Sequence, residues 1–109
     1  MAHESSADAR LTAALEALRD AGATGLSLRE THALAEEYGC AVRVVEERAL
    51  AVGLAPTRYA RNLGTTGLGG QARLLRACVA VVGCGGLGGW IIEVLARMGV
   101  GRLVLIDGD

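Results

Sequence analysis

Apolar residues in the first half of the chain recur at helical spacing. The pattern begins with three leucines at intervals of four and three, Leu11, Leu15 and Leu18. Residues at these intervals share one face of a helix. A capping box then predicts the start of a second helix, because the Ser27 and Glu30 side chains can each bind the other residue's backbone N–H. We expect this helix to end at Gly39, where left-handed backbone geometry carries little strain, and a third helix to span about residues 42–52.

Two helices joined by a tight turn suggest a DNA-binding helix-turn-helix. The small, turn and buried positions of that motif would be Ala35, Gly39 and Val45. The charge does not favour DNA binding, because residues 26–54 carry five glutamates against three arginines. The second helix of the motif bears Glu46 and Glu47, which have the wrong sign for a surface facing phosphates. We therefore interpret this half as a helical packing module and do not expect DNA as a partner.

In the second half the pattern changes to strands that alternate with a helix. Residues 78–82 form a continuous apolar run, which is typical of a strand buried on both faces of a parallel sheet. A G-x-G-x-x-G loop follows at 83–88, and a helical pattern then runs to Gly99. The apolar side of this helix would consist of Ile91, Ile92, Leu95 and Met98. A second apolar run at 103–106 ends on Asp107.

The glycine loop has the spacing of a nucleotide site. Gly83 permits a tight turn, Gly85 lets the backbone approach a phosphate, and Gly88 lets the helix pack closely on the strand. The N-terminus of the helix offers free N–H groups and partial positive charge to an anion. Asp107 follows Gly88 by 19 residues, close to the spacing of about 20 at which an acid binds ribose hydroxyls. The alternative is that these glycines serve close packing alone.

The amino-acid composition excludes several classes of protein and site. The 109 residues are 51% hydrophobic, so the chain is not disordered by composition. All eleven basic residues are arginine, and the absence of lysine excludes a Walker A phosphate loop and a lysine nucleophile within the chain. No apolar run approaches the roughly 20 residues of a membrane span, so we expect no membrane association.

The cysteines and histidines do not predict a metal site. Cys40, Cys78 and Cys84 are odd in number and lack C-x-x-C spacing, which argues against a disulfide scaffold or a zinc site and favours a reducing cytoplasm. Cys84 lies near a helix N-terminus, which could lower its pKa, but we interpret it as a small loop residue. His32 is interpreted as a partly exposed side chain rather than a metal ligand.

Charge divides the chain into two parts. Residues 1–57 carry nine acidic residues against five arginines, whereas residues 58–109 carry three against six. We predict an α/β fold, with a helical N-terminal module at 1–57 and the first βαβ unit of a Rossmann-like nucleotide-binding domain at 58–109. Two parallel strands and one crossover helix make a poor sheet, so we expect this domain to be truncated.

Several short motifs occur in order in the second half. They are Arg58-Tyr59-Ala60-Arg61-Asn62, Gly70-Gln71, the run from Gly83 to Gly89, Gly99-Val100-Gly101, and the run from Leu105 to Asp109. As a set they resemble the ThiF/MoeB/HesA family, relatives of the ubiquitin-activating enzymes, which typically shows R-Y-x-R-Q, G-Q, V-G-x-G-G-L-G-S, G-V-G and V-D-x-D. Asn62 stands where the family usually has Gln, and Gly89 where it usually has Ser.

The resemblance implies ATP-dependent adenylylation with Mg²⁺, in which the C-terminal carboxylate of a small ubiquitin-like sulfur-carrier protein becomes an acyl adenylate. The implied nucleotide-binding residues are Gly83, Gly85, Gly86, Gly88, Asp107 and Asp109. Gly85 and Gly86 would face the phosphates, and Asp107 would hold the ribose. Arg61 would reach the phosphates of the neighbouring subunit in a homodimer, for which a bidentate guanidinium is suited.

Family members continue past D-x-D with S-N-x-x-R-Q, a lysine and a further aspartate, and many add a catalytic cysteine and a zinc-binding C-x-x-C pair. We therefore expect the parent protein to be the enzyme, residues 1–109 alone to be inactive, and any structural zinc site to lie outside this chain. Two alternatives remain open. One is an NAD(P)- or FAD-dependent oxidoreductase, and the other is a non-enzymatic helix-turn-helix binding module. Without the resemblance, Arg58 and Arg61 would be an ordinary surface pair.

Overall fold

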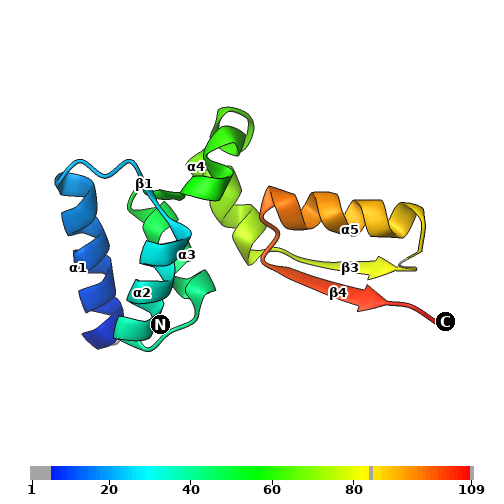
Figure 1. Ribbon diagram of the computed structural model, residues 1–109, viewed down its shortest axis with the longest axis horizontal. Coiled ribbons are helices and arrows are strands. Elements are labelled where there is room, and N and C mark those ends of the chain that lie inside the picture. The colour runs from blue at the N-terminus through cyan, green and yellow to red at the C-terminus, as the bar shows by residue number, and fades with distance from the viewer. Residues whose placement is uncertain (1–5, 84, 109) are drawn as a thin grey trace.

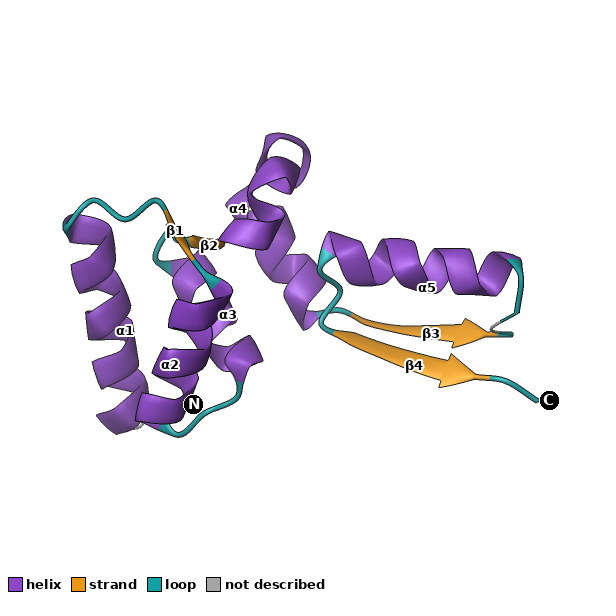
Figure 2. Cartoon of the chain, in the orientation of Figure 1, coloured by secondary structure: helices purple, strands orange, loops and turns teal. Residues whose placement is uncertain are grey.

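The computed structural model describes residues 6–83 and 85–108 and has the elements of an α/β protein. The elements of its first half are α1 (Ser6–Asp20), β1 (Gly25–Leu26), α2 (Leu28–Tyr38), α3 (Val42–Ala51) and β2 (Ala55–Pro56). Those of its second half are the 3₁₀ turn η1 (Thr57–Asn62), α4 (Leu63–Arg76), β3 (Cys78–Val82), α5 (Leu87–Met98) and β4 (Arg102–Ile106). Figures 1 and 2 show α1–α3 grouped at one end and β3, α5 and β4 at the other, with α4 between them.

Helices α1, α2 and α3 enclose a small apolar core. Its buried residues are Leu11, Leu15, Leu26, Ala35, Val45, Ala49 and Leu54. The leucine spacing in α1 therefore marks its buried face as predicted, and each buried leucine contributes roughly 1.5–3 kcal/mol. Arg19 adds a polar contact between α1 and the end of α3, because its guanidinium donates to the Val52 carbonyl oxygen at 3.1 Å.

The predicted ends of α2 are confirmed. The Glu30 backbone N–H donates to the Ser27 hydroxyl at 3.1 Å, and the Ser27 N–H donates to the Glu30 carboxylate at 3.0 Å. Both bonds satisfy donors that a helix N-terminus otherwise leaves without partners. At the other end, Gly39 adopts φ +63°, and the Cys40 N–H donates to the Ala35 carbonyl oxygen.

Helix α4 was not predicted from the sequence. Four glycines between residues 63 and 70 obscure its pattern, and Gly67, at φ +68° and ψ 171°, kinks it. Its second half is regular and packs against α3, where Leu75 joins Leu50 and Ala55 in a second apolar cluster. The helical first half is thereby joined directly to the segment that leads into β3.

The second half contains the predicted strand, helix and strand. Strands β3 and β4 pair in parallel from Cys78 opposite Arg102 to Val82 opposite Ile106. Helix α5 crosses over one face of this pair (Figure 1) and ends at Gly99, which adopts φ +98°.

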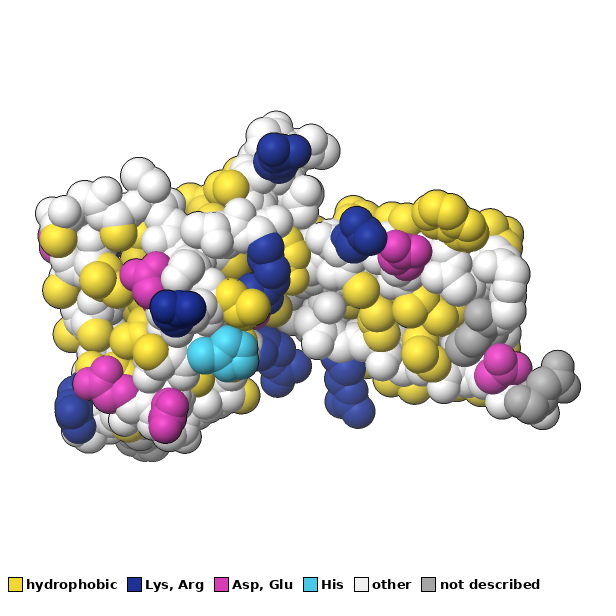
Figure 3. All heavy atoms as spheres, in the orientation of Figure 1, with side chains coloured by type: hydrophobic (Ala, Val, Ile, Leu, Met, Phe, Trp, Pro, Cys, Tyr) yellow, Lys and Arg dark blue, Asp and Glu magenta, His cyan; other side chains and the backbone are white. Residues whose placement is uncertain are grey.

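The prediction that β3 is buried on both faces is wrong for this structure. In β3 only Val81 is buried, whereas Val82 is 78% exposed and Ile106 of β4 is 50% exposed. Of the four apolar residues expected on the inner side of α5, Ile92 and Leu95 are half-buried and the other two are exposed. One helix covers one face of a two-stranded sheet, so apolar side chains remain on the surface over this end of the chain (Figure 3).

The chain is elongated. Its radius of gyration is 15.5 Å, against about 13 Å for a compact domain of this length, and its longest extent is 48 Å. Among the described residues, no helix is long and apolar enough to cross a bilayer. The division of the chain at residue 57 remains a prediction, since η1 and α4 pack on the helical half and also continue into β3.

Candidate functional site

The glycine loop and Asp107 lie at the same edge of the sheet. In a parallel pair the carboxyl ends of both strands face one way, and Val82 lies opposite Ile106. The Gly83 N–H donates to the Ile106 carbonyl oxygen at 2.7 Å, which joins the start of the loop to the end of β4. Asp107 follows directly and is exposed. The structure thus brings together the loop and the acid that the sequence paired by spacing.

The glycines of the loop have different structural requirements. Gly83 and Gly86 adopt φ +83° and +53°, a region that favours glycine. A Cβ on Gly88 would collide with the Gly83 carbonyl oxygen, so Gly88 serves the close packing of helix on strand as predicted. A Cβ on Gly85 would meet open space. Packing therefore explains Gly88 but not Gly85. Cys84 lies outside the described residues.

The N-terminus of α5 is suited to an anion. Gly86 is the N-cap residue and forms no side-chain capping hydrogen bond, because it has no side chain. The Gly88 N–H donates to the Gly85 carbonyl oxygen. The first turn of a helix leaves further backbone N–H groups without partners inside the helix. The 12-residue helix adds the positive end of its dipole. Open space beside Gly85 and Gly86 leaves room for a phosphate there.

Of the two acids in the D-x-D pattern, only the first lies within the described residues. Asp107 directly follows β4, whereas Asp109 lies outside the described residues. Within residues 6–83 and 85–108, no group of three or more His, Cys, Asp or Glu side chains could hold a metal ion. His32 is exposed on α2.

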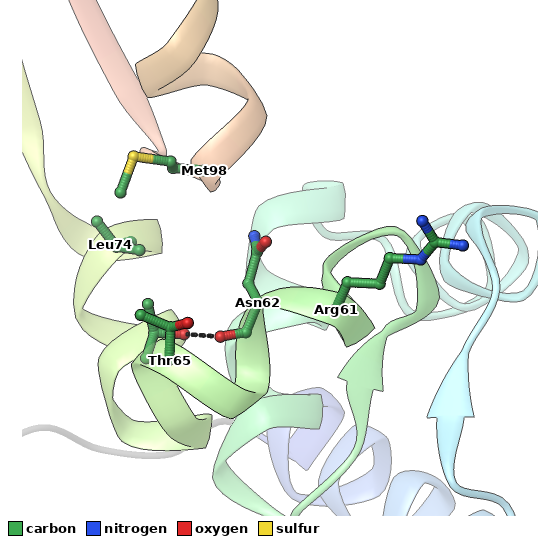
Figure 4. Close-up of a pocket in the computed structure, with 6 residues that line it drawn as sticks. Arg61, Asn62, Thr65, Leu74 and Met98 are labelled. Carbon is green, nitrogen blue, oxygen red and sulfur yellow. Dashed lines mark hydrogen bonds between the residues drawn. The ribbon is translucent and has the colours of Figure 1, made fainter.

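Arg61 lies far from the glycine loop. It lines a pocket of about 180 Å³ between η1, α4 and the C-terminal end of α5, together with Asn62, Thr65, Thr66, Leu74 and Met98. In Figure 4 its guanidinium points away from Leu74 and Met98. The loop is at the opposite end of α5, which is roughly 18 Å long. The described part of the chain gives the Arg61 side chain no hydrogen-bond or ion-pair partner.

Arg58, by contrast, is held in place. It forms an ion pair with Glu46 of α3, and its guanidinium stacks over the Tyr59 ring at 4.6 Å from the ring centroid. The Glu46 side chain is only 4% exposed. Glu46 therefore does not lie on the exposed surface of α3 that the charge argument against DNA binding considered, because α4 and η1 cover that side of α3. Glu47 also faces this segment, 3.7 Å from Arg76.

Three of the motif residues, Tyr59, Gln71 and Gly99, lie together at the C-terminal end of α5. The sequence did not predict this arrangement. The buried Gln71 side chain donates to the Met98 carbonyl oxygen at 2.9 Å and so satisfies the C-terminal end of α5. A Cβ on Gly99 would collide with the Gln71 amide and press on the Tyr59 ring. Nearby, a Cβ on Gly101 would collide with the Leu75 carbonyl oxygen. These glycines are required by packing between α4, α5 and β4.

Comparison with known proteins finds a family match in the second half of the chain. The family model that matches the chain is described as "ThiF family" and covers residues 59–109. The bovine "Adenylyltransferase and sulfurtransferase MOCS3" is 56% identical over 54 residues, which are 48% of this chain and 12% of that protein. The "SAMP-activating enzyme E1" of Haloferax volcanii is 50% identical over 54 residues, 48% of this chain and 20% of the relative.

A third relative has a different name. The "tRNA threonylcarbamoyladenosine dehydratase" of Haemophilus influenzae is 55% identical over 38 residues, 35% of this chain and 15% of that protein. The chain thus matches between about an eighth and a fifth of the length of these relatives. No solved structure matches it significantly.

Proposed function

We propose that the protein is an ATP-dependent adenylyltransferase, from the premise that residues 59–109 match the ThiF family model. The observation that carries the proposal is the glycine loop, the open α5 N-terminus and Asp107 at one sheet edge. This edge offers an anion site next to an acceptor for hydroxyl groups, as a nucleotide requires. We propose that residues 58–109 are the first part of a Rossmann-like domain, with residues 1–57 a separate helical module.

The proposed substrate is the C-terminal carboxylate of a small ubiquitin-like sulfur carrier. Two of the relatives are named as a sulfurtransferase and as an activating enzyme E1. A carboxylate oxygen attacks the α-phosphorus of ATP, the bond to the bridging oxygen breaks, and pyrophosphate leaves with the electron pair. The product is an acyl adenylate. When bound with ATP, Mg²⁺ would supply positive charge to the phosphates.

Each candidate residue has a role in this scheme. Gly85 and Gly86 let the backbone approach the phosphates at the α5 N-terminus, and Asp107 accepts hydrogen bonds from the ribose. Asp109 is proposed to assist Asp107 in binding the nucleotide. Arg61 is proposed to stabilise the departing pyrophosphate of the neighbouring subunit in a homodimer, since it lies at the far end of α5 from its own loop.

The first test uses the full-length protein and labelled pyrophosphate. We expect exchange of label into ATP that depends on a carrier with a free Gly-Gly carboxyl terminus, and we expect ATP with Mg²⁺ to bind more tightly than NAD. Tighter binding of NAD would instead support the oxidoreductase alternative.

The second test replaces Arg61. We expect Arg61→Ala to lower the exchange rate by about 100-fold, the cost of removing one preorganised charge-stabilising donor. Arg73→Ala is the matched control, because Arg73 is also an exposed arginine and lies on α4. Equal rates in the two variants would remove Arg61 from the site.

A modified tRNA is the second candidate substrate. One relative is named for threonylcarbamoyladenosine in tRNA, and that group carries a carboxylate open to the same adenylylation. The excess of arginine in residues 58–109 is compatible with a nucleic-acid partner. Pyrophosphate exchange stimulated by tRNA, and not by the carrier protein, would favour this substrate.

A further inference from the structure

A buried ion pair joins the helical half of the chain to the turn that carries Arg61. Glu46 lies in α3, its side chain is 4% exposed, and the Arg58 guanidinium of η1 binds its carboxylate. A buried carboxylate requires such a partner, because removing a charge from water is costly without one. Glu46 lies outside the stretch that matches the ThiF family model, which begins at residue 59, whereas Arg58 is the first residue of the R-Y-x-R motif.

Further contacts continue from this pair toward α5. Burial alone would lower the Arg58 pKa, but the contact with Tyr59 and the charge of Glu46 outweigh it, so the Arg58 pKa lies above its ordinary value. Arg58 is therefore a permanent cation at this position. The Tyr59 ring beneath it packs against Gly99, the residue that ends α5.

The geometry of η1 links Arg58 to Arg61. A 3₁₀ helix has three residues per turn, so residues three apart lie one above the other on the same side. Arg61 follows Arg58 by three residues in η1, which spans Thr57–Asn62. An anchor at Arg58 therefore sets the rotation of η1 about its axis and with it the direction in which the exposed Arg61 side chain leaves the turn.

We propose that Glu46 is a positioning residue, which holds Arg58 so that η1 presents Arg61 to the phosphates of a nucleotide. The inference rests on the proposed function of Arg61. It assigns the helical module, which lies outside the family match, a part in the reaction. The competing interpretation is that the Glu46–Arg58 pair only stabilises the packing of α3 against η1 and α4.

A double-mutant cycle on the full-length protein separates these interpretations. We expect Glu46→Gln to lower the rate of pyrophosphate exchange by about 10- to 100-fold, because a misplacement of about 1 Å costs that much. Glu47→Gln is the matched control. Glu47 is the adjacent residue on α3 and is more exposed, so we expect its replacement to change the rate by less than about twofold.

The decisive result is the combined variant. If Glu46 acts through Arg61, then Glu46→Gln/Arg61→Ala is no slower than Arg61→Ala alone. Two losses that multiply would overturn the proposal, as would an unchanged rate in Glu46→Gln. If Arg61→Ala is itself fully active, Glu46 has nothing to position and the inference fails, although adenylylation stands. A wild-type protein with no exchange activity would instead remove the proposed function.

Two further measurements keep the inference testable if Glu46→Gln folds poorly. Glu46→Leu/Arg58→Met removes both charges and leaves none buried without a partner, so it should fold and lose exchange to the same extent. Full activity in that folded variant would overturn the proposal. Hydrogen exchange of the amides of residues 57–62 should also become faster in Glu46→Gln than in Glu47→Gln. Equal protection in the two variants would show that the pair does not hold η1.

Discussion

Gly85 and Gly88 lie three residues apart in the same loop, but different forces account for them. At Gly88 the Gly83 carbonyl oxygen occupies the space that a Cβ would need. At Gly85 that space is open, and the described chain gives no steric reason for glycine. The structure therefore separates a glycine required by the fold from one available to a ligand, a distinction that the G-x-G-x-x-G pattern does not make.

Because of this difference, we expect alanine to lower the stability of the fold at Gly88 and to weaken ligand binding at Gly85. Gly88→Ala should destabilise the fold by about 1–3 kcal/mol, because the new methyl group forces backbone to move. Gly85→Ala should change the stability by no more than about 0.5 kcal/mol but weaken ATP binding. Thermal unfolding together with nucleotide titration measures both effects. A stable Gly88→Ala, or a Gly85→Ala that binds ATP normally, would contradict these assignments.

At the scale of elements, hydrogen bonds at the helix ends stabilise the helices. The capping box at the start of α2 makes the stability of the fold depend on pH. The Glu30 pKa lies below its ordinary value, chiefly because its carboxylate accepts the Ser27 backbone N–H and also interacts with the Ser27 hydroxyl. A pKa that is lower in the folded state stabilises the fold above the unfolded pKa and loses this effect as pH falls through the folded value.

Glu30→Gln isolates the charge, because glutamine can keep the hydrogen bond. We expect it to lower the free energy of unfolding at pH 7 by less than about 1 kcal/mol, since the site is exposed to solvent. The difference from wild type should shrink as pH falls through the lowered Glu30 pKa, where the folded wild-type carboxyl group takes up a proton. Urea unfolding across this range tests the prediction. Glu36→Gln, on the exposed face of α2, controls for the change in net charge. A difference that does not depend on pH would exclude a role for the charge.

The sequence patterns predicted α5 and β3 but not α4. Periodicity and Gly99 correctly located the end of α5, and the apolar run at 78–82 matched β3 residue for residue. The same patterns missed α4, because its glycines have poor helix propensity and its stability comes from packing of Leu75 and Gln71. They also overstated the burial of β3, since an apolar run does not reveal how many faces of a sheet are covered.

At the scale of the whole molecule, the elongated arrangement separates the two parts of the proposed site. Arg61 and Met98 line one pocket, whereas the glycine loop and Asp107 are at the other end of α5 and the sheet. Because α5 is roughly 18 Å long, the Arg61 side chain near its C-terminal end does not reach a nucleotide at its N-terminal end. This separation favours the proposal that Arg61 acts on the nucleotide of a neighbouring subunit.

Mixing two impaired variants of the full-length protein tests action between subunits. In a mixed dimer of Arg61→Ala and Asp107→Ala, one site has both the intact Asp107 and the partner's intact arginine. With random pairing, about a quarter of the wild-type exchange activity should return. Each variant alone should remain strongly impaired at the same concentration. No recovery after confirmed subunit exchange would mean that Arg61 acts within its own subunit or not at all.

The amino-acid sequence by itself determined the helix ends, the strand–loop–helix–strand order and the pairing of the glycine loop with Asp107. These features depend on periodicity, capping groups and backbone geometry within a few residues, or on the shared edge that parallel strands impose. Only the tertiary structure decided that Glu46 is buried against Arg58 and that Gln71 binds the end of α5. It also decided that Arg61 lies away from the loop. These contacts join residues 12 to 27 positions apart, and which side chains meet there depends on how the helices pack.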